Sequence, residues 1–174
     1  AVSNVANLFT IGLALMQKTS DISDQLHPNA QYVEPTYNCY GAEVDFFGAI
    51  HTIKCFEDNS LVREVLDTNG QGRVLVVDAG GSKRCAMLGD QLAAKAVKNN
   101  WSGVIIYGLI RDSEMINEMP IGVRALGTHP LKSIKKGLGE AGLTLCFSGV
   151  NFIPGDYLYA DQDGIIVVKE LVSC

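Results

Sequence analysis

Residues 73–112 read RVLVVDAGGSKRCAMLGDQLAAKAVKNNWSGVIIYGLIRD. Two continuous runs rich in Val, Leu and Ile, at 73–78 and 104–108, are typical of strands buried on both faces of a sheet. Between them, apolar residues recur with the period of an α-helix at Leu92, Ala93, Ala96 and Val97. A buried strand, a helix and a second buried strand predict parallel neighbours in an α/β sheet.

The flanking sequence adds elements on both sides of this unit. Asp58-Asn59-Ser60 has the composition of an N-cap for a helix over 60–67, and residues 43–55 have that of a strand with a kink or bulge at Gly48. The other expected elements are a capped helix starting at Thr19-Ser20-Asp21, a strand at 121–126, a mobile loop at 127–142, and short strands at 143–147, 150–153, 158–160 and 165–168. We therefore predict a single α/β domain with a mixed central sheet and a second β layer.

Composition and charge limit the class of protein. The chain has 174 residues, of which 47% are hydrophobic and 19% charged, as in one globular domain. The formal net charge of −5 provides no overall basic field, so nucleic acid is not expected as a direct partner. The apolar run at 5–16 is too short to span a bilayer. It could be an amphipathic or partner-covered helix, a processed remnant or foreign sequence.

The cysteines and histidines form no visible metal or disulfide pattern. The five cysteines are scattered without a Cys-x-x-Cys pair, and the three histidines lie far apart in the sequence. This disfavours a structural zinc site and favours reduced cysteines in a reducing compartment, the cytoplasm.

A candidate site lies where the two central strands end. Ligands of open α/β sheets bind beyond the carboxyl ends of strands, where loops lead into helices. The turn at 89–92 opens a helix there, and its free backbone N–H groups suit a carboxylate or phosphate. Arg111, after the second strand, adds a bidentate contact to the same anion. Asp112 beside it supplies a hard oxygen ligand for Mg²⁺ or Mn²⁺.

Ordinary structural interpretations compete with this site. Gly89-Asp90 could be a simple helix N-cap, and Arg111-Asp112 a surface pair. No Gly-x-Gly-x-x-Gly or Gly-x-x-x-x-Gly-Lys-Ser/Thr motif and no nucleophile elbow is visible. The lysine-rich stretch at 127–137 could be a basic lid over an anionic substrate or a solvated loop. The aspartates at 156, 161 and 163 are interpreted as turn residues.

Seven motifs in order resemble those of the RraA-like family, over about residues 19–168. They are TSDISD at 19–24, KCFEDN at 54–59, GRVLVVD at 72–78, LGD at 88–90, IRD at 110–112, ALGTHP at 125–130 and PGDYLYAD at 154–161. The family includes class II 4-hydroxy-4-methyl-2-oxoglutarate aldolases and regulators of ribonuclease activity A. The resemblance implies an α/β/β/α sandwich that assembles into trimers or hexamers. Residues 19–174 would form this domain, and residues 1–18 an extension outside the match.

The resemblance also implies an activity and residue roles. The aldolase members use a divalent metal, Mg²⁺ or Mn²⁺, to cleave 4-hydroxy-4-methyl-2-oxoglutarate to pyruvate, and they decarboxylate oxaloacetate. By matched motif, Asp112 would bind the metal, and Asp90 would act through metal-bound water. Arg111 would hold or polarise the small α-keto acid. The substrate's carboxylate and keto region would lie on Gly89, Asp90, Gln91 and Leu92.

One position departs from the aldolase pattern. Three residues after Asp112 that pattern has an acid, whereas this chain has Met115, with Glu114 one place earlier. The family also offers an alternative function, a non-catalytic regulator that binds an RNA-degrading endonuclease or an RNA helicase through its acidic surface.

Overall fold

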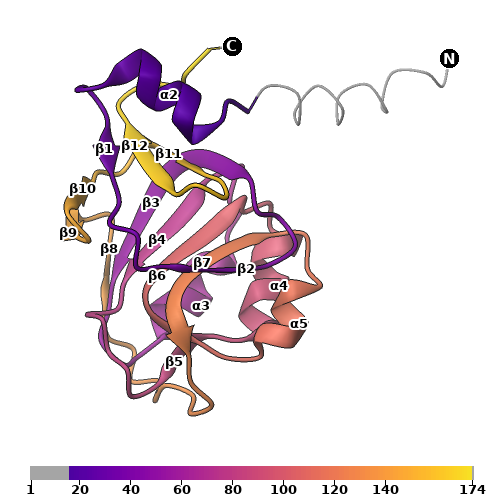
Figure 1. Cartoon of the computed structure of the whole chain (residues 1–174). Coiled ribbons are helices and arrows are strands. Elements are labelled where there is room, and N and C mark those ends of the chain that lie inside the picture. Colours follow the sequence, from indigo (N-terminus) through magenta and orange to yellow (C-terminus); the bar gives the residue numbers. More distant parts are fainter. Residues whose placement is uncertain (1–15, 174) are drawn as a thin grey trace, which may run out of the picture.

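The computed structural model describes residues 16–173 (Figure 1). The apolar run discussed above lies outside the described residues, except for Met16. None of the described helices has the length and apolarity needed to cross a membrane. The elements in chain order are α2 (Thr19–Leu26), β1 (Gln31–Tyr32), β2 (Asn38–Tyr40), β3 (Phe46–Lys54), α3 (Ser60–Leu66), β4 (Val74–Asp78), β5 (Ala86–Leu88), α4 (Asp90–Lys98), β6 (Gly103–Ile110), α5 (Ser113–Asn117), β7 (Gly122–Thr128), β8 (Glu140–Ala141), β9 (Leu145–Phe147), β10 (Val150–Phe152), β11 (Tyr157–Ala160) and β12 (Ile165–Val168).

The two apolar runs form adjacent central strands. β4 and β6 pair in parallel, from Val74 opposite Gly103 to Asp78 opposite Tyr107. The main sheet has the order β1-β12-β11-β3-β4-β6-β7-β2, with β5 added on β6 and β8 on β3. Its centre, β3-β4-β6-β7, is parallel and its flanks are antiparallel. The predicted mixed sheet is confirmed, and both central strands end at the same edge.

Strand β3 connects the two β layers. Residues 46–49 pair antiparallel with β11, whereas residues 50–54 pair in parallel with β4. The strand continues through Gly48, where a kink or bulge was expected, and changes its partner between Ala49 and Ile50 instead. A Cβ atom on Gly48 would lie 2.2 Å from the Gly72 carbonyl oxygen. Glycine is therefore required at this position by the close approach of another segment.

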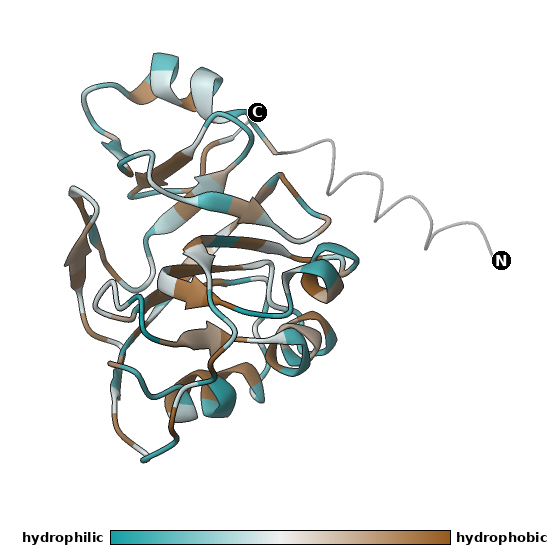
Figure 2. Cartoon of the chain, turned by 60° about the horizontal axis from the view of Figure 1, so that its bottom comes forward, coloured by the Kyte–Doolittle hydropathy of each residue, from teal (hydrophilic) through white to brown (hydrophobic). Residues whose placement is uncertain are grey.

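Four layers follow from the burial pattern. Helices α3, α4 and α5 cover one face of the central sheet (Figure 1), around a core that includes Val62, Ala96, Ile116, Val77 and Ile106. On the opposite face, β9–β12 pack against it through Phe152, Leu158, Val167, Val76 and Ile105. Helix α2 covers the outer side of β11 and β12 with Ile22 against Tyr159, Ile166 and Val168. In Figure 2 the hydrophilic residues of α3–α5 lie on their outer sides. The α/β/β/α order is confirmed.

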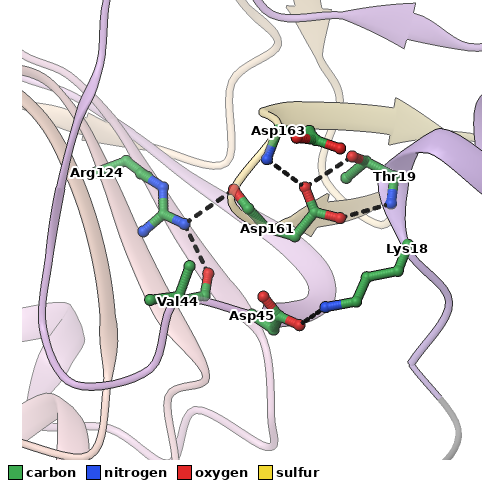
Figure 3. Close-up of polar contacts among 7 residues, drawn as sticks. All are labelled: Lys18, Thr19, Val44, Asp45, Arg124, Asp161 and Asp163. Atoms are coloured by element: carbon green, nitrogen blue, oxygen red, sulfur yellow. Dashed lines mark hydrogen bonds and ion pairs between the residues drawn. The ribbon is translucent and has the colours of Figure 1, made fainter.

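Helix α2 is attached to the domain by a buried aspartate. The expected cap at Thr19-Ser20-Asp21 is wrong in detail, because the N-cap residue is Lys18, whose side chain makes no capping hydrogen bond. Asp161 instead accepts hydrogen bonds from the Thr19 main-chain N–H and from Thr19 Oγ1, both at 2.7 Å (Figure 3). Lys18 forms an ion pair with Asp45 beside it. Asp161 is buried and joins the C-terminal β layer to α2, so it is more than the turn residue expected.

The segment at 127–142 is more structured than the loop expected there. Strand β7 continues to Thr128, and β8 pairs with the end of β3. The N-cap lies within the predicted 58–60, at Asn59, but the side-chain contact comes from Asp58, whose Oδ1 accepts hydrogen bonds from the main-chain N–H and the Oγ of Ser60. Strand β5 was not predicted, and it brings the turn at 89–92 beside the end of β6.

Candidate active site

Two loops meet at the carboxyl edge of the sheet. Strand β5 leads into Gly89 and helix α4, and β6 leads into Arg111, Asp112 and helix α5. The two strands are parallel neighbours, with Leu88 opposite Ile110. The main-chain N–H of Arg111 donates to the Leu88 carbonyl oxygen at 2.9 Å, so the strand pairing extends to the site itself. The two predicted candidate segments therefore lie side by side.

Asp112 links the two loops. Its backbone is left-handed, with φ of 54°, an uncommon conformation for a residue other than glycine. Its Oδ2 accepts a hydrogen bond from the Asp90 main-chain N–H at 3.2 Å and lies 3.7 Å from Arg111 Nε. The first amide of α4 is therefore satisfied by Asp112 and is not free for a ligand. The side chain of Asp112 stays 36% exposed.

Gly89 makes this contact possible. A Cβ atom there would lie 2.8 Å from Asp112 Oδ2 and 3.5 Å from Arg111 Nε. Its φ of −123° is available to any residue, so the requirement is for space and not for backbone freedom. Asp90, the next residue, accepts the Gln91 main-chain N–H on its own Oδ1 at 2.8 Å.

All the candidate residues predicted at these turns line one pocket of about 200 Å³. They are Gly89, Asp90, Gln91, Leu92, Arg111 and Asp112. The lysine-rich stretch contributes Lys132 and Lys135 to the same pocket, as the basic-lid interpretation required. The two candidates considered separately in the sequence thus form one cavity. Met115 lies outside this lining, exposed on α5.

Other lining residues were missed by the sequence analysis: Asn59, Arg63 and Lys95. Arg63 and Lys95 lie on the polar sides of α3 and α4, and nothing in the local pattern separates them from solvated charges. Asn59 is buried, and its Nδ2 donates to the Met87 carbonyl oxygen at 3.2 Å. Its buried Oδ1 accepts no hydrogen bond from the described residues, which leaves an acceptor available at the pocket wall.

The lining is strongly cationic. Arg63, Arg111, Lys132 and Lys135 contribute positive charge, against the carboxylates of Asp90 and Asp112, whereas Lys95 is ion-paired with Asp67 outside the lining. Arg111 forms an ion pair with Asp112, with 3.7 Å between Nε and Oδ2, and its side chain remains 38% exposed to a ligand. This balance favours an anion with more than one carboxylate.

The donor set fits a hard divalent cation better than zinc. Within residues 16–173, no three His, Cys, Asp or Glu side chains gather closely enough to form a metal cage. Mg²⁺ is usually held by one or two carboxylates together with waters and substrate oxygens. The partly exposed carboxylate of Asp112, with Asp90 on the same pocket, fits that pattern.

Comparisons with known proteins show the family of the chain. The family model described as RraA-like, Aldolase/RraA, matches residues 19–167. The chain belongs to the RraA-like family. A relative from Laribacter hongkongensis is 55% identical over 148 residues, which cover 85% of this chain and 93% of that protein. A relative from Aromatoleum aromaticum is 55% identical over 150 residues, which cover 86% of this chain and 94% of that protein. Both carry the name "Putative 4-hydroxy-4-methyl-2-oxoglutarate aldolase".

Two solved structures of the RraA-like fold are similar throughout. One is named S-adenosylmethionine:2-dimethylmenaquinone methyltransferase, from Geobacillus kaustophilus. It is 49% identical with a TM-score of 0.88, covering 90% of this chain and 97% of that one. The other is the RNA-processing inhibitor RraA from Thermus thermophilis, 42% identical with a TM-score of 0.88, covering 91% and 96%.

Proposed function

We propose that this RraA-like protein is a metal-dependent class II aldolase. It cleaves 4-hydroxy-4-methyl-2-oxoglutarate into two molecules of pyruvate and also decarboxylates oxaloacetate. The observation that supports this best is the cationic pocket that combines Arg111 and Asp112 with Lys132 and Lys135. Both substrates are dicarboxylic α-keto acids, which match this charge distribution. The names carried by relatives at 55% identity agree with the proposal.

The side chains divide the work as follows. Arg111 holds the α-keto acid end of the substrate and stabilises the negative charge that develops on its keto oxygen. Lys132 and Lys135 bind the second carboxylate. Asp112 holds Mg²⁺ or Mn²⁺, which supplies Lewis-acid polarisation of the keto group. Asp90 accepts the proton of the 4-hydroxyl through an intervening water. The C3–C4 bond then breaks, C4 becomes the keto carbon of one pyruvate, and the bond electrons pass to C3 to give the enolate of the other. Return of the proton from Asp90 to C3 through the same water completes the second pyruvate.

The test is pyruvate release from each substrate with Mg²⁺ or Mn²⁺. We expect turnover that EDTA removes and restored metal recovers. Asp112→Ala should abolish it, and Arg111→Lys should lower kcat by about a hundredfold, because a lysine cannot reproduce the bidentate contact. Asp156→Asn, at a turn outside the pocket, is the matched control and should retain activity. A wild-type protein without metal-dependent turnover of either substrate contradicts the proposal.

A second candidate function is regulation of an RNA-degrading enzyme. It is favoured by the similarity to the Thermus inhibitor and by the net charge of −5. A pull-down with a ribonuclease or an RNA helicase as bait tests it, and a lack of retention at low salt contradicts it. The two functions do not exclude each other, because catalysis uses the pocket and regulation uses the outer surface.

Methyl transfer, which the name of the Geobacillus structure attributes to that protein, fits this pocket poorly. S-adenosylmethionine carries a sulfonium cation, and the lining is dominated by arginine and lysine side chains. We therefore do not extend that activity to this chain.

The family resemblance further leads us to propose a trimer or hexamer in the cytoplasm. Large apolar side chains that remain exposed support burial in an assembly: Phe56, Leu131, Ile134 and Leu138. The proposed compartment is a reducing one, in which Cys39, Cys55, Cys85 and Cys146 would remain free thiols. Sedimentation equilibrium checks the assembly, and a monomer at micromolar concentration contradicts it.

A further inference from the structure

Asp58 is a buried carboxylate that the proposed reaction does not use. Only 2% of the residue is exposed. Its Oδ1 accepts hydrogen bonds from the Ser60 main-chain N–H at 2.9 Å and from Ser60 Oγ at 2.6 Å. Its Oδ2 accepts the main-chain N–H groups of Lys136 at 2.8 Å and Leu138 at 3.1 Å. One carboxylate thus joins the start of α3 to a loop about 80 residues further along the chain.

The two following residues extend the same connection. Ser60 Oγ accepts the Gly137 main-chain N–H at 3.1 Å. The main-chain N–H of Asn59 donates to Ser133 Oγ at 3.2 Å, and Ser133 is buried. Asn59 Nδ2 also reaches the Met87 carbonyl oxygen on β5. The tripeptide 58–60 therefore binds the loop at 133–138 on one side and the strand that leads to Gly89 on the other.

The loop has anchors at its ends and depends on this tripeptide in between. Before it, the Ala86 main-chain N–H donates to the Leu131 carbonyl oxygen at 2.7 Å, and after it β8 pairs with β3. Between these anchors, the hydrogen bonds of residues 133–138 go to residues 58–60. Burial alone would raise the pKa of Asp58, but the hydrogen bonds from Ser60, Leu138 and Lys136 lower it to about 2. The carboxylate is therefore ionised at neutral pH.

We propose that Asp58, with Asn59 and Ser60, is a positioning element that holds Lys135 on the wall of the candidate pocket, beside Lys132, which a β-bridge to Ala86 places there. The inference deepens the proposed function, because these lysines are assigned there to the second carboxylate of the substrate. Asp58 acts through the loop and does not contact the ligand. Its removal weakens recognition of dicarboxylic α-keto acids and leaves recognition of monocarboxylic ones unchanged.

The first test measures the loop directly. Asn has the shape of Asp but presents an NH₂ group to main-chain N–H donors on one side, so Asp58→Asn breaks part of the connection. We expect amide hydrogen exchange at residues 136–138 to accelerate at least about tenfold. Ser60→Ala, a milder change, should accelerate exchange mainly at Gly137 and serves if Asp58→Asn does not fold. Asp156→Asn should leave this exchange unchanged. Unchanged exchange in both loop variants overturns the proposal.

The second test measures ligands without turnover. Calorimetry with Mg²⁺ compares 2-oxoglutarate, a dicarboxylate, with pyruvate, a monocarboxylate. Asp58→Asn should weaken the binding of 2-oxoglutarate at least about tenfold and change the affinity for pyruvate by less than about twofold. In a Lys132→Ala/Lys135→Ala background the same substitution should have no further effect, because the effect passes through the lysines. The proposal is overturned if Asp58→Asn lowers the affinity for both ligands equally. It is also overturned if the substitution lowers the affinity further in the variant that already lacks both lysines. The proposed function itself is tested by a different measurement: it fails if the wild-type protein releases no pyruvate from either substrate.

Discussion

Gly89 is the residue whose lack of a side chain lets the two loops of the candidate site come together. The glycine leaves room for Asp112 Oδ2, which bonds to the next main-chain N–H. Gly89→Ala should push the Asp112 carboxylate aside, because the short aspartate can move at little cost to stability. We expect metal-dependent turnover to fall by about a hundredfold, with the melting temperature nearly unchanged.

The matched control is Gly127→Ala at the end of β7. A Cβ atom on Gly127 would lie 3.4 Å from Leu109 Cδ2, an ordinary contact. This variant should keep its activity. If Gly89→Ala and Gly127→Ala have equal activity, the steric role of Gly89 is wrong.

Two elements are each held in place by a buried aspartate, Asp58 for the loop at 133–138 and Asp161 for α2. Burial alone would raise the pKa of Asp161, but hydrogen bonds from Thr19 and Asp163 lower it. The pKa of Asp58 is lowered from 3.8 to about 2. A lowered pKa means that the folded state binds the proton less well than the unfolded chain. Each carboxylate therefore stabilises the protein above about pH 4, and this contribution is lost as the pH falls through the lowered pKa of each group, which for Asp58 is about 2.

This linkage gives a prediction at the scale of the element. At pH 7, Asp58→Asn and Asp161→Asn should each lower the free energy of unfolding by about 1–3 kcal/mol, because buried donors lose an ionised acceptor. Urea titrations should show the difference from wild type narrowing below about pH 4. Asp24→Asn, exposed on α2, should stay within about 0.5 kcal/mol of wild type. A difference that is constant between pH 7 and pH 3 contradicts the assignment.

At the scale of the whole molecule, Arg124 connects the two β layers. It lies on β7 and is 2% exposed, with its guanidinium over the Phe46 ring. It donates to the carbonyl oxygens of Val44 at 2.6 Å and Asp161 at 3.4 Å (Figure 3). Within residues 16–173 it forms no ion pair, and burial lowers its pKa. Arg124 thus satisfies main-chain acceptors on both layers and does not neutralise a carboxylate.

Removal of this side chain should affect stability and not the pocket. Arg124→Ala leaves a cavity and buried carbonyl oxygens without donors, so we expect a loss of about 2–4 kcal/mol in the free energy of unfolding. The affinity for 2-oxoglutarate should be retained, because Arg124 does not line the candidate pocket. Arg63→Ala is the reciprocal control. It should bind 2-oxoglutarate more weakly, and its free energy of unfolding should stay within about 0.5 kcal/mol of wild type. If Arg124→Ala weakens ligand binding as strongly as Arg63→Ala, the separation of the two roles fails.

The local pattern predicted the elements that organise themselves locally. Hydrophobic runs predicted β4 and β6, and the helical period of apolar residues predicted α4, because each pattern lies within one short stretch of sequence. β5 was missed because three residues are too few to show a period, and it forms only by pairing with β6. The hydrogen-bond acceptor at the start of α2 was predicted wrongly, because the Thr19 main-chain N–H donates to Asp161, which lies 142 residues away in the sequence.

Sequence patterns alone predicted the α/β class, the parallel central pair and the position of residues 89–92, Arg111 and Asp112 beyond the strand ends. These features follow from local periodicity and from the rule that parallel strands end at one edge of the sheet. Long-range packing, which no local pattern predicted, brings Lys132 and Lys135 to this pocket and allows Asp58 and Asp112 to hold its parts together. The physical reason is that these contacts join segments far apart in the sequence, whose charges show no pattern until strand pairing brings them within hydrogen-bond distance.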